Sequence, residues 1–201
     1  MLSFWEHELC TVSKIKLFVG LGNPGDKYSS TRHNAGFWWI DFVVLNHRLS
    51  LKKSTKFFGA HTSTNSNGEI YFLQPYTFMN DSGKAVQAFT NFYKIKPEEI
   101  LVIHDELDIE PGKIKLKLGG GHGGHNGLKD IIQSLGSKNF WRLRVGIGHP
   151  GDKNLVSAYV LKKPMKNEFS LIEESIFNSY KIFSLLVNGE FDRAMLNLHS
   201  A

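Results

Sequence analysis

The sequence contains a single cysteine, Cys10, among 201 residues. One cysteine cannot form an internal disulfide, and Cys10 stands in no spacing typical of a metal site. We therefore expect a protein of a reducing compartment in which Cys10 takes no part in the chemistry.

Long apolar stretches are also missing. No run approaches the roughly 18 residues that a membrane-spanning helix needs. The first segment, MLSFWEHELCTVSK, has acidic residues where a signal peptide has a basic region. These absences predict a cytoplasmic protein with no membrane partner. Residues 1–14 precede the first strand signal and are interpreted as an N-terminal extension without an assigned function.

Acidic residues are in the minority, since 19 Asp and Glu stand against 24 Lys and Arg, which gives a formal charge of +5. This balance favours a polyanionic partner. The chain has no repeats, linkers or low-complexity tracts, and its length suits one buried core. We expect a single domain over residues 15–201.

Strand and helix signals alternate along the chain. Strands are predicted at 14–20, 58–64, 69–75, 100–108, 113–118 and 141–148. Helices are predicted at 37–49, at 79–94 and twice within 168–199, and a short helix after the glycine loop carries Leu128, Ile131, Ile132 and Leu135. The turn sequence NSNG makes 58–64 and 69–75 an antiparallel hairpin. The prediction is an α/β fold with a mixed, twisted sheet surrounded by helices.

The stretch GGGHGGHNGLKD, residues 119–130, contains the pattern G-x-G-x-x-G between a predicted strand and a predicted helix. A dinucleotide site needs an acidic residue about twenty positions further on, and none occurs from 131 to 151. No G-K-[ST] ending follows either. The alternative is a tight backbone path into a helix that Asn126 caps. A metal site built from His122, His125 and an acid is a further alternative, although no third ligand has a recognised spacing.

Two other segments carry polar residues at the ends of predicted strands. In GLGNPGDKYSSTRHNAGF, Asn23 follows the first strand and His33 precedes a helix, which Thr31 or Asn34 could simply cap. In HDELD, Asp105 ends a buried strand. A carboxylate in that position suits the orientation of an imidazole such as that of His33.

Four segments together resemble bacterial-type peptidyl-tRNA hydrolases, in the order of that family. They are LFVGLGNPGDKYSSTRHNAGF, QPYTFMNDSGKAV, IHDELDIEPGKIKLKLGGGHGGHNGLKDII and FWRLRVGIGHPGDK. The resemblance implies a single α/β domain that acts as a monomer, without a metal or cofactor. It also implies hydrolysis of the ester between a peptide and the 3′ ribose of tRNA, which recycles tRNA from stalled translation.

The resemblance assigns catalysis to three residues: His33 as the base that activates water, Asp105 as the group that holds it, and Asn23 in the crevice. The expected substrate-binding residues are Tyr28, Met79, Asn80, His125 and Asn126. Either Asn23 or Asn126 could donate to the oxyanion. No G-x-S-x-G nucleophile motif occurs, so direct attack by water is preferred over an acyl-enzyme.

The alternating segment KIKLKL places Lys115 and Lys117 on one face of a half-buried strand, and Arg144 stands on a similar strand, WRLRVGIG. By resemblance, Lys117 and Arg144 grip the 5′ phosphate end of the acceptor stem, and Lys115 lies beside Lys117. A non-catalytic RNA-binding module with the same basic face is the remaining rival hypothesis.

Overall fold

The structure is a computed structural model that describes residues 13–65 and 68–199. The predicted extension, 1–14, therefore lies almost wholly outside the described residues. The part of the chain that is described forms a mixed seven-stranded sheet in the order β2-β3-β4-β1-β5-β7-β6. The strands are β1 (Leu17–Gly20), β2 (Lys52–Ser54), β3 (Gly59–Thr64), β4 (Ile70–Pro75), β5 (Ile100–Glu106), β6 (Ile114–Leu118) and β7 (Trp141–Gly146).

Parallel pairing runs through the centre of the sheet, from β4 through β1 and β5 to β7. The edges are antiparallel, with β2 and β3 on one side and β6 on the other. The predicted hairpin of β3 and β4 is confirmed, and so is the α/β class with a mixed sheet. The short edge strand β2 has no counterpart in the prediction.

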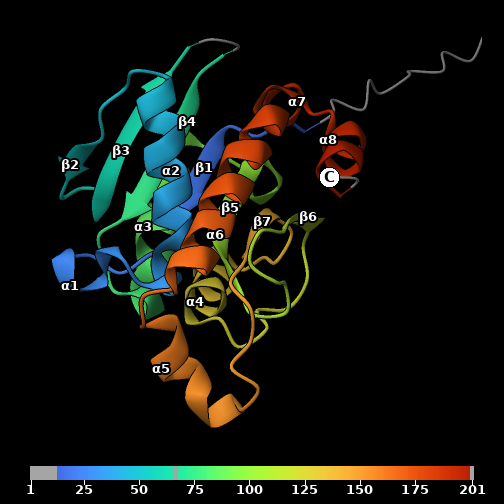
Figure 1. Cartoon of the computed structure of the whole chain (residues 1–201). Helices are drawn as coiled ribbons and strands as arrows, with labels where there is room; N and C mark the ends of the chain where they lie inside the picture. The colour runs from blue at the N-terminus through green and yellow to red at the C-terminus, as the bar shows by residue number, and fades with distance from the viewer. Residues whose placement is uncertain (1–12, 66–67, 200–201) are drawn as a thin grey trace, which may run out of the picture.

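Helices cover both faces of the sheet (Figure 1). The longer ones are α2 (Ala35–Asn46), α3 (Ser82–Tyr93), α4 (Asn126–Leu135), α6 (Lys166–Ser179), α7 (Phe183–Asn188) and α8 (Phe191–His199). The shorter ones are α1 (Asp26–Ser29) and α5 (Val156–Val160). Single 3-10 turns are η1 (Arg32–Asn34), η2 (Met79–Asp81), η3 (Pro97–Glu99), η4 (Lys153–Leu155) and η5 (Tyr180–Ile182). The first of the two predicted tail helices is in fact divided by η5 into α6 and α7.

Two hydrophobic clusters fill the space on either side of the sheet. One joins α2, α6, α7 and α8 to one face, and the other joins α3 and α4 to the opposite face. β1 and β5 are buried almost throughout because both of their faces are covered. In β6, Ile114 and Leu116 are buried while Lys115 and Lys117 are exposed, as the alternating sequence predicts.

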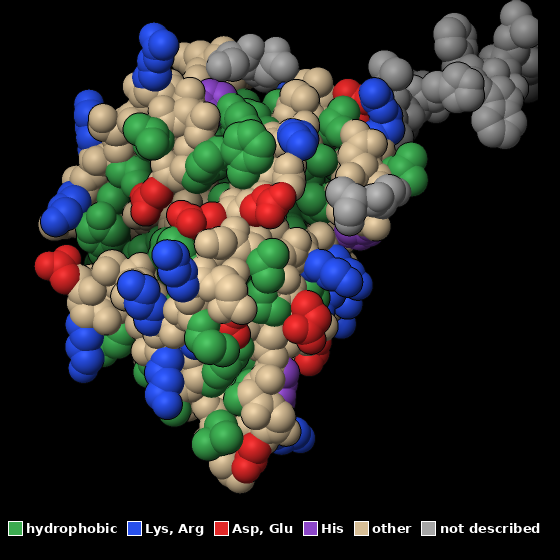
Figure 2. All heavy atoms as spheres, in the orientation of Figure 1, with side chains coloured by type: hydrophobic (Ala, Val, Ile, Leu, Met, Phe, Trp, Pro, Cys, Tyr) green, Lys and Arg blue, Asp and Glu red, His purple; other side chains and the backbone are tan. Residues whose placement is uncertain are grey.

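On the face that Figure 2 shows, lysine and arginine side chains are spread over both edges and the lower middle, with acidic side chains between them. Within the described residues, no helix is long and apolar enough to cross a bilayer.

Candidate active site

Two glycines bring the segment that carries His33 against the carboxyl ends of β1 and β5. A Cβ on Gly36 would lie 2.3 Å from the carbonyl oxygen of Ile103, and a Cβ on Gly20 would lie 2.3 Å from the carbonyl oxygen of Gly36. Only glycine allows backbones to approach this closely. The start of α2 therefore sits directly on the sheet, and η1 is held beside the end of β5.

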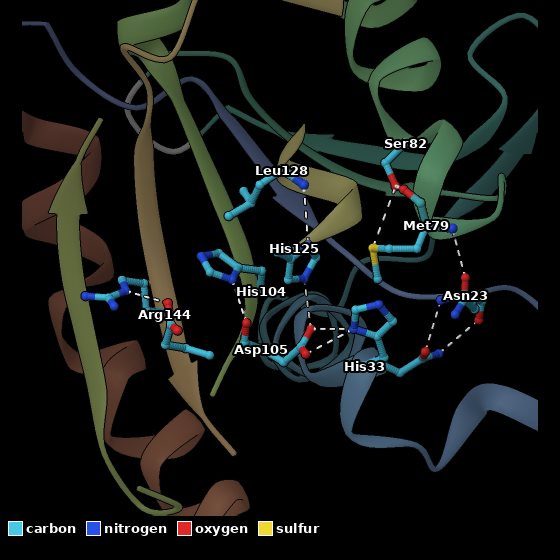
Figure 3. Close-up of polar contacts among 11 residues, drawn as sticks. Asn23, His33, Met79, Ser82, His104, Asp105, His125, Leu128 and Arg144 are labelled. Atoms are coloured by element: carbon cyan, nitrogen blue, oxygen red, sulfur yellow. Dashed lines mark hydrogen bonds and ion pairs between the residues drawn. The ribbon is translucent and has the colours of Figure 1, made fainter. Parts of the chain in front are cut away.

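Asp105 joins two imidazoles (Figure 3). His33 Nδ1 lies 2.9 and 3.0 Å from the two carboxylate oxygens, and His125 Nε2 lies 3.0 Å from one of them. His125 Nδ1 accepts the N–H of Leu128 at the start of α4, so its Nε2–H donates to Asp105. With Nδ1–H of His33 donating as well, the second nitrogen of His33, Nε2, remains for a partner in the cavity.

Burial and charge shift the pKa values of His33 and Asp105 in opposite directions. Burial lowers the pKa of His33, but the charge of Asp105 and its hydrogen bond outweigh burial, so the pKa of His33 lies above its ordinary value of 6.5. Burial raises the pKa of Asp105, yet His33 and His125 hold it well below its usual range. Asp105 is therefore ionised at neutral pH, and His33 is a stronger base than an isolated imidazole.

Hydrogen bonds hold both the side chain and the backbone of Asn23. Its side-chain oxygen accepts the backbone N–H of Met79 at 2.8 Å. The Asn34 side chain accepts the backbone N–H of Asn23 and donates to its carbonyl, each at 3.0 Å. The side-chain NH₂ of Asn23 is thus left as a donor beside the cavity. Neither Thr31 nor Asn34 caps a helix with its side chain, so the capping alternative is wrong.

A cleft of about 1080 Å³ surrounds these groups. The predicted site residues that line it are Asn23, Tyr28, His33, Met79, Asn80, Asp105, Lys117, His125, Asn126 and Arg144. Tyr28 meets Phe78 edge to face at a centroid distance of 6.3 Å, and Phe78 also lines the cleft. Lys115 is exposed on β6 and is not among the lining residues.

The glycine loop, residues 119–124, is held by Arg142. The Arg142 guanidinium donates to the carbonyl of Gly120 at 2.7 Å and to that of Gly121. Gly119, Gly120, Gly123 and Gly124 all have positive φ. Arg142 is 3% exposed, although it alternates with Arg144 along WRLRVGIG, a pattern that puts both cations on one face of the strand. Sequence reasoning missed this role because alternation does not reveal which cation is buried.

The same loop corrects two sequence-based alternatives. His125, not Asn126, caps α4, and Asn126 is the exposed first residue of that helix. β6 pairs antiparallel with β7, so this strand, loop and helix do not form the parallel βαβ unit of a dinucleotide fold.

The metal alternative rested on His122 and His125. His122 Nδ1 instead accepts the N–H of Gly124 at 3.1 Å. Among the described residues, the one cluster with metal-ligand composition is His33, Asp105 and His125, whose ligand atoms lie within 4.8 Å of one another. Within this cluster, the Asp105 carboxylate already accepts from both imidazoles, through His33 Nδ1 and His125 Nε2.

Arg144 lies beside the cleft with a partner of its own. Its Nε donates to the carboxylate of Glu106 at 2.8 Å. Lys117, one strand further out on β6, is exposed and lines the cleft. The two predicted phosphate-binding cations therefore differ, because the charge of Arg144 is partly neutralised.

His104 is a buried neighbour of this centre that sequence reasoning did not single out. Its Nδ1–H donates to the carbonyl of Asp105 at 2.7 Å, and its ring meets that of His125 at 5.1 Å. Its Nε2 is buried without a hydrogen-bond partner. Burial, and then the charge of His125, lower the pKa of His104 to about 3.

Acid is expected to destabilise the fold through His104. In the unfolded chain, His104 is protonated below about pH 6.5, whereas in the folded protein it stays neutral down to about pH 3. Because the unfolded state then binds one more proton, the free energy of unfolding falls by up to about 1.4 kcal/mol for each pH unit. Urea unfolding between pH 7 and pH 5 measures this slope. His104→Asn retains a donor for the Asp105 carbonyl and is expected to reduce this slope, whereas an equal slope in both proteins would contradict the assignment. The raised pKa of His33 changes stability above pH 6.5, and the lowered pKa values of His47, His61 and His199 add to the slope equally in both proteins.

Comparison with known proteins gives a consistent result. The family model described as peptidyl-tRNA hydrolase matches residues 17–201. The peptidyl-tRNA hydrolase of Pasteurella multocida is 56% identical over 191 residues, which cover 94% of this chain and 98% of that protein. That of Delftia acidovorans is 55% identical over 187 residues, covering 92% and 90%. The crystal structure of the Acinetobacter baumannii enzyme superposes with a TM-score of 0.90 at 49% identity, covering 93% of this chain and 95% of that one.

Proposed function

Since the chain belongs to the peptidyl-tRNA hydrolase family, we propose that it hydrolyses its substrate with a water molecule that His33 activates. The bond cleaved is the ester between the peptide carboxyl group and the 3′ ribose of tRNA. The observation that carries this proposal is the buried pair of Asp105 and His33 facing the cleft.

In the first step, His33 Nε2 takes a proton from water while the water oxygen attacks the ester carbonyl carbon. Asp105 keeps the proton of His33 on Nδ1 and stabilises the imidazolium that forms. The proton then passes to the ribose oxygen as the ester bond breaks. The products are a peptide with a free carboxylate and a tRNA with a free 3′ hydroxyl. General-base help of this kind contributes about 10²–10⁴ in rate.

Asn23 is the better candidate for stabilising the oxyanion. Its amide orientation is fixed by Met79, so its NH₂ group is held in advance of the reaction. The amide of Asn126 is on an exposed residue. A donor that needs no reorganisation contributes most to such stabilisation. Asn126, Asn80 and Tyr28 are assigned to substrate binding around the cleft, and His125 to holding Asp105.

In the cell, this activity would return tRNA from peptidyl-tRNA that translation has released prematurely. We assign this role to a cytoplasmic monomer that needs no metal or cofactor. The assay that tests the function is release of N-acetyl amino acid from N-acetyl-aminoacyl-tRNA, with and without EDTA. Retained tRNA binding without cleavage would instead support the non-catalytic RNA-binding module, and loss of cleavage with EDTA would support a metal hydrolase.

The cations beside the cleft give a salt-dependent prediction. Lys117→Ala is expected to raise KM and to lower the slope of log KM against log salt by about one, because each neutralised phosphate contributes roughly one unit. Arg144→Ala should lower it by less, since Glu106 already pairs with this guanidinium. KM measured over a series of KCl concentrations tests this, with Lys181→Ala on η5 as the control. An unchanged slope for Lys117→Ala would remove this residue from the tRNA interface.

A further inference from the structure

We infer that the peptide part of the substrate leaves the cleft along an exposed row of aromatic side chains, Phe78, Tyr76 and Phe58, flanked by Lys53 and Lys84. This inference rests on the proposed function and adds a subsite to it. The ligand is an extended peptide segment upstream of the esterified residue, with a preference for acidic or aromatic side chains.

The order of strands in the sheet indicates the direction in which the peptide extends from the ester. Lys117 and Arg144 stand on β6 and β7 at one side of the sheet. Asp105 ends β5, and Asn23 follows β1, the next strand along. Figure 3 shows Arg144 on one side of Asp105 and Asn23 with Met79 on the other. If RNA is held on the β6 side and the ester lies between, the peptide continues toward β4, β3 and β2.

The aromatic row begins in the cleft and continues on that side. Phe78 lines the cleft and is 56% exposed, and Tyr76 and Phe58 are each 39% exposed. The backbone N–H of Tyr76 donates to the carbonyl of Phe58 at 2.8 Å, which joins the end of β4 to the turn between β2 and β3. Phe78 follows Tyr76 by two residues, and Tyr76 is hydrogen-bonded to Phe58, so the backbone places the three aromatic residues next to one another. Exposed apolar surface next to a cleft is typical of a binding site.

The turn displays Phe58 in an unfavourable backbone conformation. Phe58 has φ 49°, a left-handed value that is rare for a bulky residue. Hydrogen bonds on both sides hold it, from its own N–H to Thr55 and from Tyr76 to its carbonyl. Its neighbour Phe57 is 4% exposed and packs against Phe89 of α3. Phe57 anchors the turn, so Phe58 is free to face outward.

Two lysines complete the surface. Lys84 Nζ lies 4.2 Å from the ring centre of Phe58, and Lys53 Nζ lies 5.6 Å from that of Tyr76. Both lysines are exposed. Such pairs offer an apolar face with a positive rim, which fits acidic and aromatic peptide side chains together with backbone carbonyls. The position of the row, on the side of the sheet away from Lys117, favours peptide over RNA as its occupant.

The experiment compares two substrates on the same tRNA. One carries an N-acetyl-aminoacyl group, and the other carries an N-acetylated pentapeptide with the same C-terminal residue and acidic residues upstream. For the wild type we expect a higher kcat/KM with the pentapeptide. Tyr76→Ala and Lys53→Glu are each expected to reduce the ratio of the two kcat/KM values by about threefold to tenfold, the size of one or two exposed contacts.

A matched pair elsewhere provides the control. On α6, Phe177 is 57% exposed and Lys181 Nζ lies 5.9 Å from its ring centre. Phe177→Ala and Lys181→Glu are expected to keep the wild-type ratio. Equal losses on both substrates in Tyr76→Ala and Lys53→Glu would overturn the inference in favour of tRNA contact. A wild-type ratio near one would overturn it as well. Absence of cleavage of the short substrate by the wild type would instead refute the proposed function, so the two failures are distinguishable.

Discussion

Replacing His33 with alanine is expected to lower kcat for release of N-acetyl amino acid from N-acetyl-aminoacyl-tRNA by about 10²–10⁴. The imidazole is the base that Asp105 orients, and no other described side chain shares that bond to Asp105 except His125. KM should change little, because the tRNA contacts assigned to Lys117 and Arg144 are separate from His33. Steady-state kinetics with and without EDTA measures both constants.

The pH profile is the stricter part of this test. The base must be neutral to accept a proton, and the pKa of His33 is raised above 6.5. Wild-type kcat/KM should therefore decline as the pH falls through a value above 6.5, and the residual activity of His33→Ala should lack this decline. A mutant that keeps wild-type kcat, or that keeps the same acidic limb, would show that another group is the base.

Replacing Asn23 with aspartate is expected to lower kcat by about 10²–10³, the cost of losing one oxyanion donor. Aspartate retains an oxygen to accept the N–H of Met79, so the local fold is preserved. It replaces the NH₂ donor with a carboxylate oxygen, which repels the developing negative charge. Single-turnover rates with saturating enzyme isolate this chemical step from binding.

Asn126→Asp is the matched comparison. It makes the same chemical change on an exposed residue at the start of α4. If Asn23 is the oxyanion donor, the loss for Asn126→Asp should be smaller and should fall mainly on KM. A larger loss of kcat in Asn126→Asp would transfer the role to Asn126. Thermal unfolding of both variants checks that neither loss reflects an unfolded protein.

The sequence allowed the sheet, most helices and the residues around the cleft to be predicted, because alternating and buried runs depend on local patterns. It could not show that His33 and Asp105 touch, since that contact depends on how α2 crosses the sheet. Gly20 and Gly36 allow the close contact of α2 with the sheet on which this crossing depends. The sequence shows that these residues are glycines, but it does not show which backbone segments they approach.

The sequence also could not show which hydrogen-bond partners the polar side chains of the site have. Asn23 and Asn126 were equivalent candidates in sequence, and the bond from Met79 together with the burial of Asn23 distinguishes their amides. Arg142 and Arg144 occupy equivalent places in an alternating strand, yet one holds the glycine loop and the other pairs with Glu106. His104 escaped notice because a histidine inside an apolar run gives no sign of its partners.

The contact of Gly20 with Gly36 bears on redesign of this scaffold. The distance between His33 and Asp105 depends on direct backbone contact between α2 and the strands β1 and β5. A Cβ added at Gly20 or Gly36 would lie 2.3 Å from a carbonyl oxygen of the facing segment. Directed-evolution libraries that randomise these two positions would mostly yield inactive proteins. Diversity aimed at new ester substrates is better placed in loop positions beside the cleft, such as 76–78, where changes in shape leave the paired backbones in register.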